Sequence, residues 1–400
     1  MPTDDEHVAV DDNEQVAQRE VSSDANEAPK RLRRGLRVAI SIVVVLGAAV
    51  FIASRWSVPY YAITPGHAFN IGTLISVPGA RSHSHKGSVI LTDVDLTPLS
   101  ALGYVYYELH DSSAIIGSAA LTGGQNNSAY TEEGVIDMAN ARQAATLVAL
   151  RTLGYDTRAI ANGTAVYATE PGTKNTQAPD VGSVIVAADG QSALTATQLT
   201  RAISARTAGS VFSLTFHALG KEKTTTRTYR LGDLARSTKA TGSVLECVPS
   251  GGHVARPVTK QGKVRGCLPF DVVQTYRNAA LPFVVKLSSG GIVGPSAGLS
   301  FTLGLIEKLD RKDLTGGARV AATGTMSNDG SVGAVGGVAE KTRAVRAAGA
   351  EVFLVPPSGL QAARANAGPH LKIIDVSSIG QAVSALEGLG GRLEPSAGRV

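Results

Sequence analysis

The chain has 400 residues, of which 43% are hydrophobic, and this is enough for two or three domains with buried cores. Its formal net charge of +5 is modest, and no basic stripe with interleaved aromatic residues occurs, which argues against nucleic-acid binding. The sequence has no Gly-x-x-x-x-Gly-Lys-Ser/Thr phosphate loop, so we expect no ATP-driven step within this chain and no cofactor.

The first 56 residues predict a tail and a membrane anchor. Residues 1–35 are polar: an acidic stretch comes first and a basic cluster follows it. They contain too few apolar residues to form a core, so we expect a disordered tail. Residues 36–56 contain an uncharged apolar run at 38–54, which as a helix is about 26 Å long. Arginines and aromatic residues at its ends extend the span toward the thickness of a bilayer.

Charge asymmetry around this run predicts its orientation. Positive residues precede the run and few follow it, which places the N-terminus in the cytoplasm and everything after Trp56 outside the membrane. A cleaved signal peptide and a buried core helix are the competing interpretations. The long acidic leader and the aromatic residues after the run favour an uncleaved, single-pass anchor.

Residues 57–159 predict a mixed α/β segment. Two strands, at 74–77 and 87–91, are joined by a Pro-Gly turn, and an amphipathic helix follows over 138–153. This pattern resembles, loosely, the first half of a Lon-type proteolytic domain.

Two histidines, His83 and His85, lie between the predicted strands. A metal site there needs a third ligand that the sequence does not identify, and the neighbouring Arg81 and Lys86 disfavour a cation. We therefore expect a solvated loop and no metal site.

Residues 160–232 predict an inserted domain. Its elements are a strand at 164–169, a strand leading into the Asp189-Gly190 hairpin turn, a helix at 195–203, and two further strands. Their order resembles a bacterial PDZ domain, which binds an extended peptide as an added strand. The resemblance implies that strand 164–169 receives the peptide. The implied peptide-binding residues are Asn162, Gly163, Thr164, Ala165 and Val166. The alternative is a small α/β domain without a ligand.

The chain has two cysteines, Cys247 and Cys267. Outside the membrane they would form one disulfide, which closes a loop of about twenty residues and contributes about 3 kcal/mol in the loop-entropy model. In a reduced compartment they would be two unrelated buried thiols. The predicted topology favours the disulfide.

Residues 233–389 carry the pattern that points to chemistry. An apolar run at 281–287 predicts a strand, and a helix is predicted from Ser296 to near Leu309. A serine at a helix start is surrounded by unpaired backbone N–H groups, which can stabilise an oxyanion. Gly294, Ala297 and Gly298 have little side chain and allow close approach of a substrate, and Pro295 is a further supporting residue beside Ser296.

A serine hydroxyl needs a base, and Lys341 can supply it. No histidine lies near Ser296, whereas Lys341 stands on a helix predicted over 337–348 among small apolar residues. Such surroundings lower the pKa of a lysine by desolvation. Glu340 is adjacent in sequence, but adjacent helical residues do not face each other. Taken alone, Ser296 is an ordinary helix N-cap and Lys341 an ordinary solvated lysine.

Three motifs together resemble the proteolytic domain of Lon-type proteases: Gly294 to Gly298, Thr323-Gly324, and the Gly-Gly-x-x-Glu-Lys run that ends at Lys341. The resemblance implies that Ser296 is the nucleophile, that Lys341 is the general base, and that Thr323 is a hydrogen-bond partner of the lysine. One position departs from the family, because Val293 stands where many Lon proteases have an acidic residue.

The whole layout resembles the membrane-anchored Lon-like serine proteases that contain a PDZ domain, the YlbL type. We therefore expect an α/β (α+β) fold in which a Lon-type proteolytic domain carries an inserted PDZ-like domain, follows one transmembrane helix and ends in a flexible tail at 390–400. The implied activity is an ATP-independent serine endopeptidase that cleaves extracytoplasmic polypeptides. Its partners would be polypeptide substrates and the lipid bilayer, with self-assembly left open.

Two other functions remain compatible with the sequence. The PDZ-like domain could bind peptides on a catalytically inert protease fold, which would make the chain a scaffold. A Ser-Lys enzyme of another kind, such as an amidase acting on cell-wall peptides, would share the site and differ in substrate.

Overall fold

The computed structural model describes residues 36–109, 114–169, 178–204, 206–233, 263 and 266–394. The predicted tail at 1–35 and the last six residues lie outside this description. Two compact units divide the chain, one comprising 1–59 with 98–110 and the other 60–97 with 111–400.

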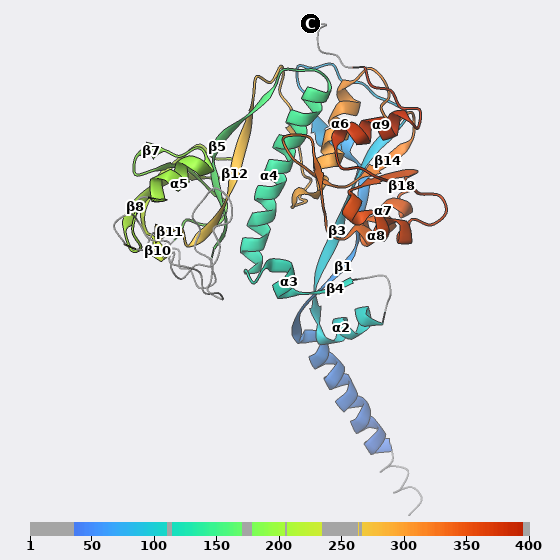
Figure 1. The fold of residues 1–400 in the computed structure, drawn as a ribbon. Coiled ribbons are helices and arrows are strands. Elements are labelled where there is room, and N and C mark those ends of the chain that lie inside the picture. The colour runs from blue at the N-terminus through green and yellow to red at the C-terminus, as the bar shows by residue number, and fades with distance from the viewer. Residues whose placement is uncertain are drawn as a thin grey trace, which may run out of the picture. The chain divides into compact units, whose positions relative to one another are not determined.

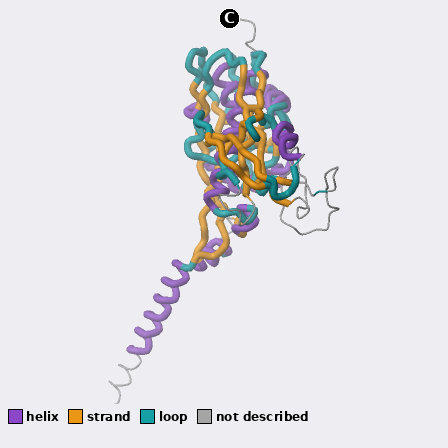
Figure 2. The backbone as a smooth tube through the Cα atoms, turned by 90° about the vertical axis from the view of Figure 1, so that its left-hand side faces the viewer, coloured by secondary structure: helices purple, strands orange, loops and turns teal. Residues whose placement is uncertain are grey.

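The first unit contains a helix, Leu36–Arg55, with a mean hydropathy of 2.6. Within the described residues it is the one helix that is long and apolar enough to cross a membrane, and nearly all of its side chains are exposed. It leads directly into strand β1 (Ser57–Asn70), as Figure 2 shows. The short helix α2 (Ala101–Glu108) also belongs to this unit, and Ser100 caps its start by accepting a hydrogen bond from the Gly103 N–H at 3.1 Å. The predicted apolar helix is confirmed.

The second unit is built on a six-stranded sheet with the order β18-β17-β14-β3-β1-β4 (Figure 1). Strands β3, β14, β17 and β18 run parallel, whereas β4 pairs antiparallel with β1. The bounds are β3 (Ser88–Ser100), β4 (Ala114–Gly117), β14 (Arg319–Ala322), β17 (Val352–Val355) and β18 (Lys372–Asp375).

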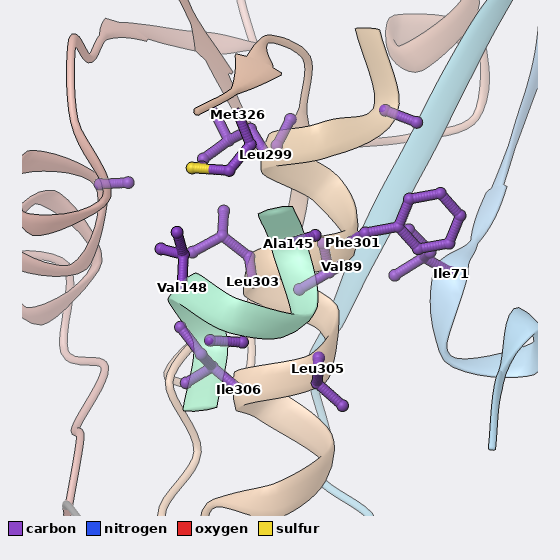
Figure 3. Packing of buried hydrophobic residues seen from close by; sticks show 14 of the residues in the cluster. Ile71, Val89, Ala145, Val148, Leu299, Phe301, Leu303, Leu305, Ile306 and Met326 are labelled. Atoms are coloured by element: carbon purple, nitrogen blue, oxygen red, sulfur yellow. The ribbon is translucent and has the colours of Figure 1, made fainter. Parts of the chain in front are cut away.

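Helices cover both faces of this sheet, because alternate strand residues point to opposite sides. Val320 and Ala322 join a core with α4 (Asn127–Thr152), α6 (Gly298–Leu309) and α9 (Ile379–Glu387). Ala321 and Phe353 join a second core with α7 (Val338–Ala347) and α8 (Leu360–Asn366). Figure 3 shows side chains of α6 and α4, among them Leu303 and Val148, gathered in the first core. The sheet therefore separates α6 from α7.

Short elements complete this part of the chain. They are η1 (Ile71–Leu74), β2 (Ile75–Ser76), α3 (Ser118–Thr122), β13 (Lys286–Leu287), η3 (Pro295–Ala297), β15 (Thr325–Met326), β16 (Val332–Gly333) and η4 (Pro357–Gly359).

Two local predictions are wrong. Strands β2 and β3 do not pair with each other: β2 pairs with β13, and β3 lies in the large sheet beside β14. Of the strand predicted at 281–287, only Lys286 and Leu287 adopt strand geometry. Both errors come from partners that are distant in sequence and that periodicity cannot identify.

The segment predicted as an insert forms a sheet of its own, with the order β12-β5-β6-β8-β9 and β7 beside β6. Its helix α5 (Ala196–Ser204) packs over a separate core. Its strands are β5 (Arg158–Thr169), β6 (Ser183–Ala188), β7 (Gln191–Ser192), β8 (Val211–Ala218), β9 (Thr225–Arg230) and β12 (Phe270–Ala279). Strands β10 (Gly232–Asp233) and β11 (Gly266–Cys267) form a separate two-stranded sheet.

The core of this segment extends past the predicted boundary at 232. Leu268 and Phe270 are fully buried in it, although they follow the long stretch that contains Cys247. Cys267 is also buried. Cys247 lies outside the described residues, so the disulfide stays a prediction.

Candidate active site

Ser296 lies in η3, the tight turn that opens into α6. Gly294 precedes it with φ of +90°, a conformation that favours glycine, and Pro295 occupies the first position of the turn. The Gly294 N–H donates to the carbonyl of Gly134 in α4 at 2.8 Å. Ser296 is half-buried. The backbone N–H groups of Ser296 and Ala297 belong to a first helical turn, where such groups have no partner within the helix.

The residues that follow β14 hold the backbone of Ser296 in place. The Gly324 N–H donates to the Ser296 carbonyl at 3.0 Å, and the Thr323 hydroxyl donates to the same oxygen at 3.3 Å. The Leu299 N–H donates in turn to the Gly324 carbonyl at 3.1 Å. Gly298 packs so closely here that an added Cβ would lie 2.7 Å from the Met326 nitrogen. The start of α6 is thus fixed against the end of β14.

Lys341 approaches the end of β14 from the face of the sheet opposite to α6. It stands in the first turns of α7, with 3% of its surface exposed, and its Nζ donates to the Thr323 hydroxyl at 3.4 Å. Thr323 is fully buried. A chain of two hydrogen bonds therefore connects the Lys341 amine to the backbone of Ser296 through Thr323.

Burial lowers the pKa of Lys341 from 10.5 to about 8, and the charge of Asp93 in β3 opposes part of that fall. Asp93 is half-buried, and one of its oxygens accepts the His67 N–H at 2.5 Å. At pH 7 a lysine with this pKa is neutral in about one molecule in ten, and at pH 8 in about half. Lys341 can accept a proton near neutral pH.

Glu340 turns away from the lysine. Its carboxylate pairs with Arg343 on the same helix at 3.1 Å, and Arg343 also donates to the Asn366 side chain at 2.7 Å. The expectation that Glu340 does not hold Lys341 in its charged form agrees with this pairing.

The arrangement suits nucleophilic catalysis on a carbonyl. A half-buried serine stands in a first helical turn, where backbone N–H groups have no partner within the helix, and a buried amine of lowered pKa is bonded to Thr323 beside the same turn. Comparison with known proteins points the same way. Residues 274–386 match the Lon protease (S16) C-terminal proteolytic domain. This domain is that of a serine peptidase. No curated protein matches the chain.

The matched Lon-type segment contains Ser296, Thr323 and Lys341, but two contributors to the site lie before it. Asp93 comes from β3, and Gly134 comes from α4. Sequence inspection found neither, because a single acid in a strand and a single glycine in a helix carry no pattern. Val293, which stands where many Lon proteases have an acidic residue, is 43% exposed. It packs on α4 at Gly134, where an added Cβ would lie 3.1 Å from the Val293 Cβ.

The strand predicted to receive a peptide is paired within the chain itself. Thr164 and Ala165 of β5 pair with β6 on one edge and with β12 on the other, so neither edge is open at these residues. The Gln274 side chain of β12 donates to the carbonyls of Gly163 and Leu194 and accepts the N–H at the start of α5. Strand β12 thus lies beside the predicted peptide-binding residues, and their role stays a prediction. Asn162 and Val166 lie in the same strand, and Val166 is fully buried.

The segment with His83 and His85 is a loop, as predicted, and Arg81 and Lys86 in it are exposed. Both histidine side chains are half-buried, and His85 Nε2 lies 3.1 Å from the Asp310 carbonyl.

Proposed function

We propose that this chain is an ATP-independent serine endopeptidase in which Ser296 is the nucleophile and Lys341 the general base. The observation that carries the proposal is the buried Lys341 amine, with a pKa lowered to about 8, bonded to Thr323, which in turn bonds the Ser296 carbonyl. A surface lysine would hold its proton and could not act as a base at neutral pH.

The mechanism follows from these positions. The Lys341 amine takes the proton of the Ser296 hydroxyl as the oxygen attacks the peptide carbonyl. The N–H groups of the first turn stabilise the resulting oxyanion. The protonated Lys341 then gives its proton to the departing amine, and the peptide bond breaks to leave an ester on Ser296. Water, deprotonated by the same amine, hydrolyses this ester and restores the hydroxyl.

The helix Leu36–Arg55 anchors the enzyme, with the N-terminus in the cytoplasm and the catalytic part outside. Its length and hydropathy, and the basic residues that precede it, support this topology. The substrates are then extracytoplasmic polypeptides. A protease added to the outside of sealed cells or spheroplasts should remove a C-terminal tag and leave an N-terminal tag intact; the opposite pattern would refute the topology.

The PDZ-like insert acts on the site through α4 and not as an open peptide groove. The Tyr167 hydroxyl of β5 donates to Asp137 of α4 at 3.0 Å, and Gly134, less than one turn away, accepts the Gly294 N–H. Tyr167→Phe should therefore lower kcat several-fold. Tyr229→Phe is the matched control, because the hydroxyl of Tyr229 is buried in the insert with no partner among the described residues. Equal rates in both variants would contradict a role through α4.

The decisive experiment uses the full chain in detergent. A fluorophosphonate probe should label wild type, and neither Ser296→Ala nor Lys341→Ala should be labelled or cleave a casein-type substrate. Ser288→Ala is the control. Ser288 is an exposed serine in the segment that leads to Ser296, and its hydroxyl accepts the Gly290 N–H, with no hydrogen bond to a lysine among the described residues. Labelling that survives in Ser296→Ala, or its absence in wild type from pH 7 to pH 9, would refute the assignment.

A further inference from the structure

Three potential metal ligands meet at the end of α6 that is farther from Ser296. His85 comes from the loop before β3, Glu307 from the last turn of α6, and Asp313 from the turn that follows. One ligand atom from each lies within 4.8 Å of the other two. Donors around one zinc ion stand about 3 to 4 Å apart, because each bond is about 2.0 to 2.2 Å long. The cluster needs to close by about 1 Å to hold an ion.

One oxygen of the buried Glu307 carboxylate has no hydrogen-bond partner among the described residues, although burial makes such a partner necessary. Glu307 is 8% exposed, and while one oxygen accepts the Leu314 N–H at 2.9 Å, the other is buried with no hydrogen bond among the described residues. Asp313 stands beside it and accepts the Thr315 hydroxyl at 2.7 Å. Two carboxylates this close repel each other unless a proton or a cation lies between them.

The imidazole of His85 has a backbone partner for one ring nitrogen and can keep the other for a metal. When its Nε2–H donates to the Asp310 carbonyl, its Nδ1 keeps a lone pair for a metal. Histidines that bind metals commonly use the second ring nitrogen in this way, and the bond fixes both the tautomer and the ring direction.

The loop that carries His85 is fixed rather than free. The His83 N–H donates to the Lys308 carbonyl at 2.8 Å, and the Ser88 N–H donates to the Ala318 carbonyl at 3.1 Å. Gly87 fits where an added Cβ would lie 2.6 Å from the Ala318 oxygen. The ligand is thus held in place before any ion arrives.

Solvent can reach the cluster. A cavity of 380 Å³ is lined by His83, His85 and Glu307 together with residues of η1. Lys308 also lines the cavity, but its amine donates to the Gly72 carbonyl at 3.0 Å and is thereby turned to η1. The cavity provides an entry path and room for water ligands.

We propose that His85, Glu307 and Asp313 bind one zinc-type divalent cation. One imidazole and two carboxylates balance the charge of such an ion, and an imidazole ligand favours zinc over magnesium or calcium. Glu307 lies eleven residues after Ser296 along the helical direction, about 16 Å away. The ion therefore does not act on the substrate. It clamps the end of α6 to the His85 loop and the turn at Asp313.

A shared proton is the alternative to a cation. Burial raises the pKa of Glu307 to about 7, so at lower pH a proton could lie between the two carboxyl groups. In that case the cluster would bind no zinc, and its stabilising effect would disappear above neutral pH.

The test uses the full chain in detergent, freed of metal with a chelator. Equilibrium dialysis with zinc chloride at pH 7.5 should give one zinc per chain, and zinc but not magnesium should raise the midpoint of thermal unfolding. His85→Ala and Asp313→Asn should each weaken zinc binding at least about tenfold and abolish this rise. His83→Ala is the matched control, because His83 lines the same cavity outside the cluster, and it should behave as wild type.

Three results would overturn the proposal. They are the absence of zinc binding by wild type, equal loss in the His83 and His85 variants, and binding that survives in both His85→Ala and Asp313→Asn. We expect Asp313→Asn to fold normally, because Asp313 is only half-buried and the asparagine side chain has the same shape as that of aspartate. Far-ultraviolet circular dichroism should show all three variants folded.

Discussion

Replacing Lys341 by methionine should stabilise the protein and abolish its activity. Methionine fills nearly the same volume without a charge. The cost of burying the ammonium follows from the fall in the pKa of Lys341, from 10.5 to about 8. At about 1.4 kcal/mol for each pKa unit, the variant should gain about 3 kcal/mol of unfolding free energy at pH 7. The loss of the bond to Thr323 reduces this gain slightly.

The gain should depend on pH with a defined sign. The unfolded chain keeps the lysine proton up to pH 10.5, whereas the folded protein releases it near pH 8. Between these values the unfolded state binds more protons, so the stability of wild type rises with pH. The methionine variant lacks this rise. The difference should be constant below pH 8 and vanish by about pH 10.5.

The assay is denaturant unfolding of the full chain in detergent, followed by circular dichroism between pH 6.5 and pH 10.5. Lys312→Met is the matched control, because the Lys312 side chain is 48% exposed and makes only a long ion pair with Glu394 at 3.8 Å. It should change stability by less than about 0.5 kcal/mol. A methionine variant that is less stable than wild type at pH 7, or a difference that does not shrink above pH 8, would refute a desolvated amine.

Three further predictions test the surroundings of the proposed dyad. Thr323→Val should lower kcat/KM about tenfold to a hundredfold, because it removes the hydroxyl that accepts the Lys341 amine. Thr342→Val removes a buried hydroxyl that bonds within its own helix and should stay within about threefold of wild type; equal effects of the two variants would contradict a role of Thr323 in the site. Asp93→Asn should shift the alkaline rise of activity to lower pH, because it removes the charge that raises the lysine pKa; an unchanged or higher midpoint would contradict this. Gly298→Ala should cost about 1 to 3 kcal/mol in denaturant unfolding, since its methyl group meets backbone, whereas Gly336→Ala, with open space around it, should be neutral.

The sequence predicted the elements that carry the chemistry because each has a local cause. The helix after Ser296 and the helix around Lys341 follow from apolar periodicity and flanking glycines, and both occur where expected. The lowered pKa of Lys341 was also expected from its small apolar neighbours. The roles of Ser296, Thr323 and Lys341 are those that the resemblance of three motifs to Lon-type proteases implies, and the Lon-type match covers all three positions.

The rest depends on contacts between distant segments. Periodicity marks 164–169 as a strand but cannot show that β12, about a hundred residues later, pairs with it. The same holds for His85, whose two companions are separated from it by more than two hundred residues. An isolated histidine or aspartate has no sequence signal, so the cluster at the end of α6 and the contribution of Asp93 emerge only from the fold.

Substrate itself should complete the activation of Lys341. Two opposing effects set its resting pKa near 8, because burial lowers the value and Asp93 raises it, so most molecules hold the proton at pH 7. A peptide seated over the half-buried Ser296 excludes water from the turn and adds desolvation, which lowers the pKa of the amine further. Because kcat/KM reports the free enzyme and kcat the enzyme-substrate complex, the midpoint of the pH profile for kcat should lie below that for kcat/KM. Coinciding midpoints would show that substrate leaves the solvation of the amine unchanged, and the proposed base would then work only through its minor neutral form.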